Sequence, residues 1–306
     1  MRIPNKAPVA TLAVAFAFAL AGLFFSPPAT RAAQPTVDLK TAAPFAILAG
    51  TPAITDNGAS VITGNVGLSP KAGSGITGLL CAQVTGSIFA IDATGLPCFT
   101  NNGPLLVIAK NDLTAAYLDA ASRIPVTTVG TELGGTTKTA GTYISGATNF
   151  QITNVGPLVL DGQGDSSSVF IFNAPLSAPG LTVGPGSTVS LINGAQACNV
   201  FWRVDSAAIN TTAVFKGTIL ALNDITVANG ANIEGRLLAR NGQVTLINDV
   251  IKGSVCAASI NAAVTPKFPN TGVAPTSSNT LLGLGALGGL ITISILLAVA
   301  RRKHII

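Results

Sequence analysis

The side chains that could do chemistry are few, and most lie where catalysis cannot use them. The only histidine is His304, near the C-terminus, so the central region has no imidazole for Ser-His-Asp or Cys-His catalysis or for a His-ligated zinc ion. The twelve acidic residues are scattered, mostly beside glycine or asparagine, whereas polysaccharide hydrolases need carboxylates clustered along a groove. We therefore predict that the protein is not an enzyme, with no catalytic residues and no cofactor.

The densest acidic segment runs from Asp161 to Asp165 and is followed by three serines. Calcium could bind such a segment, but it lacks both the repeated GGxGxD nonapeptide of calcium-binding solenoids and the acid count of an EF-hand loop. We favour an exposed turn here and predict no metal site.

The positive charge belongs to the ends of the chain. Of 17 Lys and Arg residues, ten lie within residues 34–265, together with all 12 Asp and Glu residues. The sequence pI of about 9.2 therefore reflects the terminal segments, and we expect no nucleic-acid partner.

Residues 1–33 have the layout of a secretory signal peptide. Arg2 and Lys6 precede an apolar run at residues 9–25, which ends in two prolines and small residues. A retained membrane helix is the alternative, but the run is short for a bilayer span. We predict that this segment is removed on export.

The C-terminal segment predicts anchoring at the cell surface. A linker at residues 257–280 leads into an apolar stretch at 281–300, long enough to cross a bilayer, and a basic tail at 301–306 that should stay cytoplasmic. The linker holds a pentapeptide that resembles the LPxTG-type sorting signal of monoderm bacteria, with Phe in place of Leu: Phe268, Pro269, Asn270, Thr271 and Gly272. The resemblance implies a sortase, cleavage after the threonine and a link to the cell wall. Without cleavage the protein remains anchored by a single transmembrane helix.

Four cysteines fall in the exported region, where disulfides are stable. They allow three pairings, of which we favour Cys81 with Cys98 and Cys198 with Cys256. A catalytic or metal-binding thiol cluster is the alternative, but there is no CxxC motif and no nearby histidine.

A repeat organises the central domain, residues 34–256. Gly217, Gly235 and Gly253 are spaced by 18 residues, with short alternating runs and Asn-Gly or Asn-Asp turns between them. So short a period leaves no room for a helix and predicts a β-solenoid. Related pieces near residues 64 and 86 indicate that N-terminal coils stack on the same solenoid, which makes it discontinuous in sequence.

One segment has a different period. Apolar residues recur at intervals of three and four across residues 104–122, which predicts one amphipathic helix lying along the solenoid. The preceding stretch, residues 71–103, reads as a loop-rich cap over the solenoid end.

Several segments together resemble the secreted microbial ice-binding protein family, which is shared by bacteria, yeasts, fungi and diatoms. They are APFAILAG at 43–50, ITGNVGLSP at 62–70, AAYLDAASR at 115–123, TELGG at 131–135, VFIF at 169–172, GAQACNVFW at 194–202 and FKGTILA at 215–221. The resemblance covers residues 39–256. It implies an irregular, discontinuous, right-handed parallel β-helix, roughly triangular in section, with one long α-helix packed alongside.

Ice binding needs a flat, rigid, weakly charged face, and a solenoid repeats equivalent side chains about every 4.7–4.9 Å. The family carries a loose Thr-(Ala/Gly)-x-(Thr/Asn) pattern on its ice-facing strand, and an ice surface with its ordered water is the implied partner. By resemblance the candidate contacts are Asn57, Ser60, Thr188, Thr211, Asn229, Asn232 and Asn248. Val214 departs from the pattern, and each asparagine also suits a turn at a solenoid corner.

A second hypothesis is a wall- or membrane-anchored structural or adhesive surface module without ice activity. A Thr, Asn, Ser, Gly and Ala face free of charge would favour ice binding. A face interrupted by Val214, aromatic residues or charges would favour the adhesive module.

Overall fold

The computed structural model describes residues 34–153, 155–174 and 179–257. The predicted signal peptide, the pentapeptide at 268–272 and the apolar stretch at 281–300 lie outside these ranges. Within them, no helix is both long enough and apolar enough to cross a membrane.

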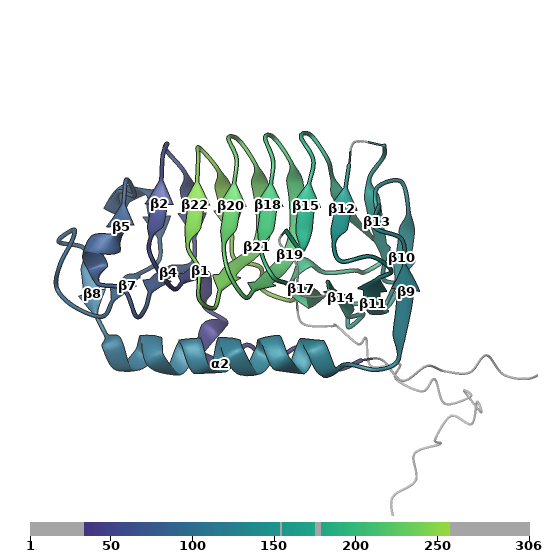
Figure 1. Ribbon diagram of the computed structural model, residues 1–306, viewed down its shortest axis with the longest axis horizontal. Helices are drawn as coiled ribbons and strands as arrows, with labels where there is room; N and C mark the ends of the chain where they lie inside the picture. Colours follow the sequence, from purple (N-terminus) through teal and green to yellow (C-terminus); the bar gives the residue numbers. More distant parts are fainter. Residues whose placement is uncertain (1–33, 154, 175–178, 258–306) are drawn as a thin grey trace, which may run out of the picture. The chain divides into compact units, whose positions relative to one another are not determined.

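Parallel strands stack into a solenoid with three faces (Figure 1). One face is a seven-stranded sheet, here called the seven-stranded face, with its strands in the order β12 (Phe150–Ile152), β15 (Leu181–Val183), β18 (Ala207–Ile209), β20 (Ile225–Val227), β22 (Val244–Leu246), β2 (Ile54–Asp56) and β5 (Ile76–Thr77).

A second face lies against the helix and is called the helix face. Its strands are β9 (Val126–Val129), β11 (Gly141–Ser145), β14 (Phe170–Asn173), β17 (Val200–Val204), the C-terminal halves of β19 (Val214–Ala221) and β21 (Asn232–Ala239), β1 (Phe45–Ala49), β4 (Asn65–Leu68), β7 (Ile88–Ala90) and β8 (Phe99–Asn101).

The third face is built from β10 (Thr137–Thr139), β13 (Leu158–Asp161), β16 (Val189–Ile192), the N-terminal halves of β19 and β21, β23 (Val250–Lys252), β3 (Val61–Thr63) and β6 (Val84–Thr85). Because β19 and β21 each run through the corner, they belong to both the helix face and the third face.

The solenoid is discontinuous in sequence, as predicted. Strand β1 pairs with β21, β2 with β22 and β3 with β23, so the N-terminal coils continue the stack where the C-terminal coils end. Arg236 locks this junction, because its guanidinium donates to the carbonyl oxygens of Ala43 at 2.8 Å and Ser254 at 2.6 Å.

Helix α2 (Gly103–Ser122) returns the chain from one end of the stack to the other (Figure 1). The Asn102 side chain caps it by accepting from the Leu105 backbone N–H, and Pro104 occupies its first turn. Its buried residues are the six that the spacing predicted: Leu106, Ala109, Leu113, Ala116, Tyr117 and Ala120. Its twenty residues span about 30 Å along the helix face.

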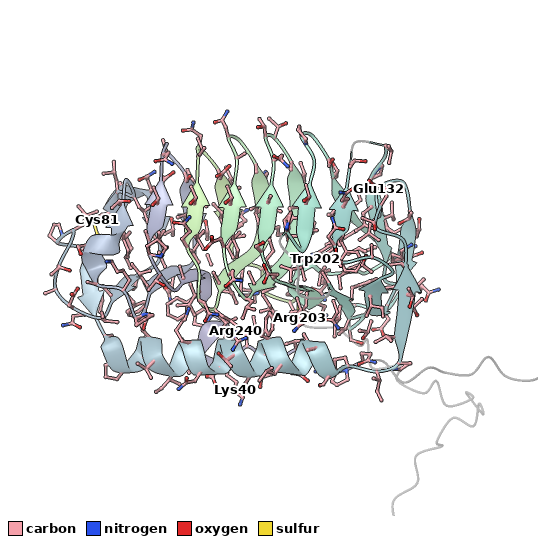
Figure 2. The ribbon with its side chains drawn as sticks, in the orientation of Figure 1. Lys40, Cys81, Glu132, Trp202, Arg203 and Arg240 are labelled. Atoms are coloured by element: carbon pink, nitrogen blue, oxygen red, sulfur yellow. A yellow bond between two sulfur atoms is a disulfide. The ribbon has the colours of Figure 1, made fainter. Side chains whose placement is uncertain are left out.

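The contact between α2 and the helix face includes cations as well as apolar side chains. The guanidinium carbons of Arg203 and Arg240 lie 4.3 and 4.8 Å from the centre of the Tyr117 ring, and Figure 2 shows both arginines beside the helix. Burial, with a contribution from the charge of Arg240, lowers the pKa of Lys110 to about 7.

The interior is apolar and layered. Inward side chains from successive coils stack, and the largest column joins Tyr143, Phe172, Trp202 and Phe215 with ring centres 5.2, 4.1 and 5.4 Å apart. Phe201, beside Trp202 in β17, is also buried and packs among the apolar side chains under α2.

The segment predicted as a loop-rich cap, residues 71–103, lies at the end of the solenoid. Strands β5, β6, β7 and β8 add a short, irregular coil to all three faces. The Cys81–Cys98 disulfide closes this coil, and the Cys198–Cys256 disulfide fastens the end of the domain, so the favoured pairing is confirmed.

The 18-residue glycine spacing has a steric cause, which predicts the effect of a methyl group. Gly235 has a φ of +156°, and a Cβ there would lie 1.8 Å from the Gly217 carbonyl oxygen of the preceding coil. Gly235→Ala should lower the free energy of unfolding by about 3 kcal/mol or more, measured by denaturant titration.

The matched control is Gly130→Ala, because a Cβ at Gly130 would meet nothing within 4 Å. It should change the free energy of unfolding by less than about 0.5 kcal/mol. Equal losses in both variants would contradict the steric explanation.

Candidate binding surface

A single row of outward side chains crosses the seven-stranded face. It consists of the middle residue of each full strand and the second residue of β5, in the order Gln151, Thr182, Ala208, Thr226, Thr245, Thr55 and Thr77. Each is in register with its neighbours, so the side chains repeat at the strand spacing of about 4.8 Å. Five of the seven are threonine, and we call this set the threonine row.

Local sequence explains why these residues face outward. In β20, Ile225 and Val227 are fully buried and Thr226 between them is exposed; in β15, Leu181 and Val183 are fully buried and Thr182 between them is half-buried. Alternation sends the aliphatic residues to the core and the threonine to the surface. Threonine also suits a strand, because its branched side chain packs well on a pleated sheet.

The positions beside the threonine row are nearly free of charge. By strand alternation, the outward residues two places before it are Asn149, Gly180, Ser206, Asp224, Gln243 and Ala53, and those two places after it include Thr153, Gly184, Asn210, Ala228, Ile247 and Asn57. Asp224 is the one charged side chain among them, and none is aromatic. The surface beside the threonine row is therefore made mostly of small or polar groups, with Asp224 as the one charged side chain at these positions.

The third face is different in chemistry. Lys216, Glu234 and Lys252 stand in register on it, and the Lys216 ammonium lies 2.7 Å from the Glu234 carboxylate. Val61 and Val250 are 52% and 42% exposed in the neighbouring row. Two faces of the same coils thus present unlike surfaces.

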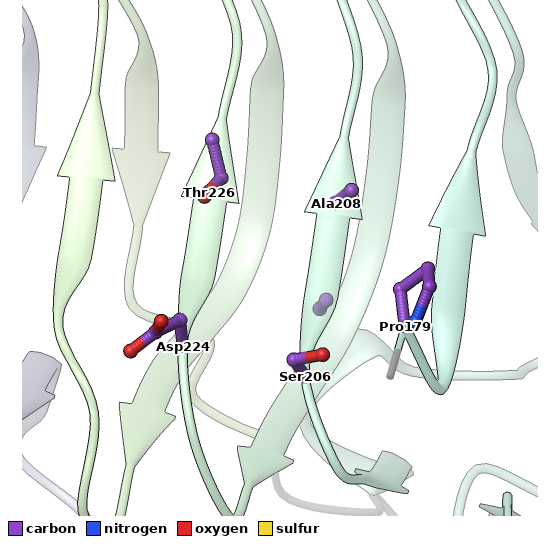
Figure 3. A pocket seen from close by; sticks show the side chains of 6 residues that line it. Pro179, Ser206, Ala208, Asp224 and Thr226 are labelled. Carbon is purple, nitrogen blue, oxygen red and sulfur yellow. The ribbon is translucent and has the colours of Figure 1, made fainter. Parts of the chain in front are cut away.

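The threonine row has one interruption, at Ala208. A shallow hollow of about 310 Å³ opens there, with Asp224 and Ser206 at its edge (Figure 3). Its lining residues are Pro179, Ser206, Ala207, Ala208, Asp224 and Thr226.

No described part of the chain gathers three His, Cys, Asp or Glu side chains that could hold a metal ion. In the acidic segment, the carboxylates of Asp161 and Asp165 accept hydrogen bonds from the backbone N–H groups of Gln163 and Ser167, as turn residues do.

The seven candidate contacts named from the sequence lie after the strands, around the corner between the seven-stranded face and the third face. Thr211, Asn229 and Asn248 occupy equivalent places, each three residues beyond the threonine-row position of its coil. Asn57 is only two residues beyond Thr55 and therefore falls outside this register. Asn232 and Thr188 lie on the far side of the corner, in one row with Val214.

Ser60 is wrong as a surface contact. Its side chain is fully buried, its hydroxyl donates to the Asp56 carboxylate at 2.8 Å, and the same oxygen accepts from the Asp249 backbone N–H. A small polar residue at a corner can turn inward to satisfy buried groups, and the sequence pattern does not distinguish that direction.

Asn248 has the turn role that the sequence left open. Its φ is +52°, its amide donates to the Asn229 side chain at 2.8 Å, and its oxygen accepts from the Ala59 backbone N–H. These bonds tie three consecutive coils together at the corner.

The five threonines of the threonine row were not among the contacts predicted from the sequence. The four-residue Thr-(Ala/Gly)-x-(Thr/Asn) pattern selects residues of the turns. The threonine row is instead marked by a threonine between two inward residues in a short run, as in Ile225-Thr226-Val227. A threonine between two aliphatic residues also occurs in β15 and β22, and β2 has Asp56 in place of the second aliphatic residue.

Two carboxyl groups are buried beneath the corner. Asp56 accepts from the backbone and hydroxyl of Ser60 and from the Gln83 amide, and Asp249 accepts from the backbone N–H groups of Ala231 and Ile247. Burial raises the pKa of Asp249 to about 6, helped by the nearby charge of Asp56, although the backbone donors act in the opposite direction.

Comparisons with known proteins agree on one family. A family model described as Ice-binding-like matches residues 47–252. An ice-binding protein of Nostoc sp. (strain HG1) is 35% identical over 274 residues, which cover 88% of this chain and 91% of the relative. An ice-binding protein of Flavobacterium frigoris (strain PS1) is 37% identical over 219 residues, which cover 70% and 75%.

Solved structures agree with the sequence relatives. An ice binding protein from an Antarctic biological consortium has a TM-score of 0.63 and 36% identity, covering 73% of this chain and 94% of the other. A domain of Shewanella frigidimarina ice-binding protein 1 has a TM-score of 0.64 and 31% identity, covering 72% and 99%.

The buried Asp249 predicts a pH dependence of stability. The folded chain holds this proton up to about pH 6, whereas the unfolded chain releases it near pH 4. The stabilisation is therefore full below pH 4 and is lost as the pH rises through 6, and the free energy of unfolding should fall by about 2 kcal/mol between pH 4 and 7 from this group. Denaturant titrations of the parent and of Asp249→Asn, which has no such proton, measure this difference. An equally steep fall in the variant would show that another group is responsible.

Proposed function

The chain belongs to the ice-binding-like family, and on that premise we propose that it binds ice through the threonine row of the seven-stranded face. Its partner is the surface of an ice crystal with the ordered water in front of it.

The observation that carries this proposal is the register of the threonine row. Thr226, Thr245, Thr55 and Thr77 occupy four consecutive strands, and hydrogen-bonded parallel ladders fix their spacing at about 4.8 Å. Each threonine offers a hydroxyl that bonds water and a methyl that excludes it. A rigid row of such groups holds water in a repeating arrangement before ice is met, so little ordering entropy is lost on adsorption.

The surroundings of the threonine row support ice over an adhesive role. Val214 and the charges of Lys216 and Glu234 belong to the third face, and the seven-stranded face carries no aromatic side chain at the outward positions described above. Protein interfaces are enriched in aromatic and arginine side chains, and the outward positions described above carry neither.

The corner residues extend the same surface. Thr211, Asn229 and Asn57 are exposed at its rim, so we assign them secondary contacts with the ice. Asn248 positions Asn229 through their hydrogen bond, while Asn232 and Thr188 lie around the corner and contribute less.

We further infer that the protein acts at the cell surface and is not an enzyme. The order of signal peptide, folded domain, pentapeptide at 268–272, apolar stretch and basic tail supports export followed by anchoring through a sortase and the wall, or through the membrane. An ice-binding surface held there would attach the cell to ice or protect its envelope.

Anchoring predicts the fate of a truncated chain. Removing residues 281–306 should release the protein into the culture medium, whereas the full chain should stay with the cell fraction, as measured by immunoblotting. Full-length protein found mainly in the medium would contradict anchoring without affecting the ice-binding proposal.

Ice binding is tested by a bulky residue in the threonine row. Thr226→Tyr should remove at least about nine-tenths of the thermal hysteresis and abolish ice-crystal shaping, because the ring breaks the water arrangement over a flat face. The matched control is Thr63→Tyr, since Thr63 is an exposed strand threonine on the third face.

Circular dichroism should show both variants folded, and Thr63→Tyr should keep the parent activity. Equal activity in the two variants, or a parent without any ice shaping, would contradict the proposal.

A further inference from the structure

The threonine row is not uniform along its length. Ala208 is the only one of its seven positions without a polar side-chain atom, and it stands between Thr182 and Thr226, with which it is in register. The hollow shown in Figure 3 opens over it, so the surface is both lower and less polar there.

This break divides the threonine row into unequal parts. On one side stand four consecutive threonines, Thr226, Thr245, Thr55 and Thr77, which span about 14 Å at the strand spacing. On the other side Thr182 stands with Gln151, whose longer and more flexible amide cannot repeat the threonine geometry.

The edge of the hollow adds a second disturbance. Asp224 is exposed there, and its carboxylate accepts from the Gln243 backbone N–H at 2.9 Å, which fixes the charge beside the gap. Water around a carboxylate orients toward the charge and does not adopt the arrangement that the neighbouring hydroxyls favour.

From these observations we propose that Ala208 sets the length of the surface that engages ice. The four consecutive threonines from Thr226 to Thr77, here called the threonine ladder, adsorb to the crystal. The hollow separates Thr182 from them. This inference rests on the proposed function and assigns to one residue the limit of its binding surface.

The site can accept the missing side chain. Ala208 is partly exposed, its neighbours in the strand point inward, and the hollow has room for a hydroxyl and a methyl group. Threonine also favours strands more than alanine does. Ala208→Thr would therefore join Thr182 to the ladder and give six consecutive threonines across about 24 Å.

Alanine substitutions in the otherwise unchanged full-length protein test the break. Thr226→Ala, within the ladder, should lower thermal hysteresis about fivefold, whereas Thr182→Ala should lower it by less than about 1.5-fold, because only the first interrupts contiguous water sites. Equal losses from the two substitutions in an active parent would overturn this inference while leaving the proposed function in place.

Filling the gap is the complementary test. Ala208→Thr should raise thermal hysteresis about twofold. In the Ala208→Thr background, Thr182→Ala should then clearly lower thermal hysteresis, because the two positions are coupled only when the row is continuous. Ala208→Val, which has the same shape without the hydroxyl, should raise it less.

No gain from Ala208→Thr, or an equal gain from Ala208→Val, would overturn the role of Ala208 in the ladder. A parent that neither shapes ice nor inhibits recrystallisation would overturn the proposed function and this inference together. Circular dichroism on each variant separates these outcomes from a loss of fold.

Discussion

The parallel hydrogen-bond ladder between successive coils is the constraint on which the rest of the structure depends. It fixes every strand at one spacing from the next and leaves no freedom of register, because a shift by one residue would exchange the buried and exposed sides. The stacked column around Trp202 follows from this constraint. So does the glycine spacing, since Gly235 must pass within contact distance of Gly217 in the preceding coil.

The chain enters the stack at its middle, so the N-terminal and C-terminal coils must be joined there and held together. Helix α2 carries the chain back along the helix face, and Arg236 binds backbone oxygens from both the first and the last segments of the domain. Burial lowers the pKa of this guanidinium, and it also lowers the pKa of Lys110, which belongs to α2. Placing cations at these junctions costs solvation free energy, which their hydrogen bonds to backbone carbonyl oxygens offset.

Three faces built from the same coils carry different surfaces because each face takes a different part of every coil. Charges and exposed valines fall on the third face, apolar groups meet α2 on the helix face, and threonine falls repeatedly on the seven-stranded face. Because the charges and exposed valines gather on the third face, the seven-stranded face is rigid and nearly free of charge while the core keeps the same packing. It also explains why a single alanine in the threonine row matters, since a repeating surface has no other element to compensate for a gap.

The sequence by itself determined the solenoid and the helix, because each depends on local periods: 18 residues between glycines, three and four between the apolar residues of α2, two within each strand. It allowed three disulfide pairings, and the structure decided between them. The tertiary structure alone decided which polar residues form a surface. Thr55 and Thr245 are far apart in the chain and become neighbours only through pairing between the N-terminal and C-terminal coils. Whether Ser60 points inward depends on the buried carboxyl groups around it, which come from two different coils. Local patterns specify strands and turns, but the register between distant coils, and therefore the binding surface, is set by packing.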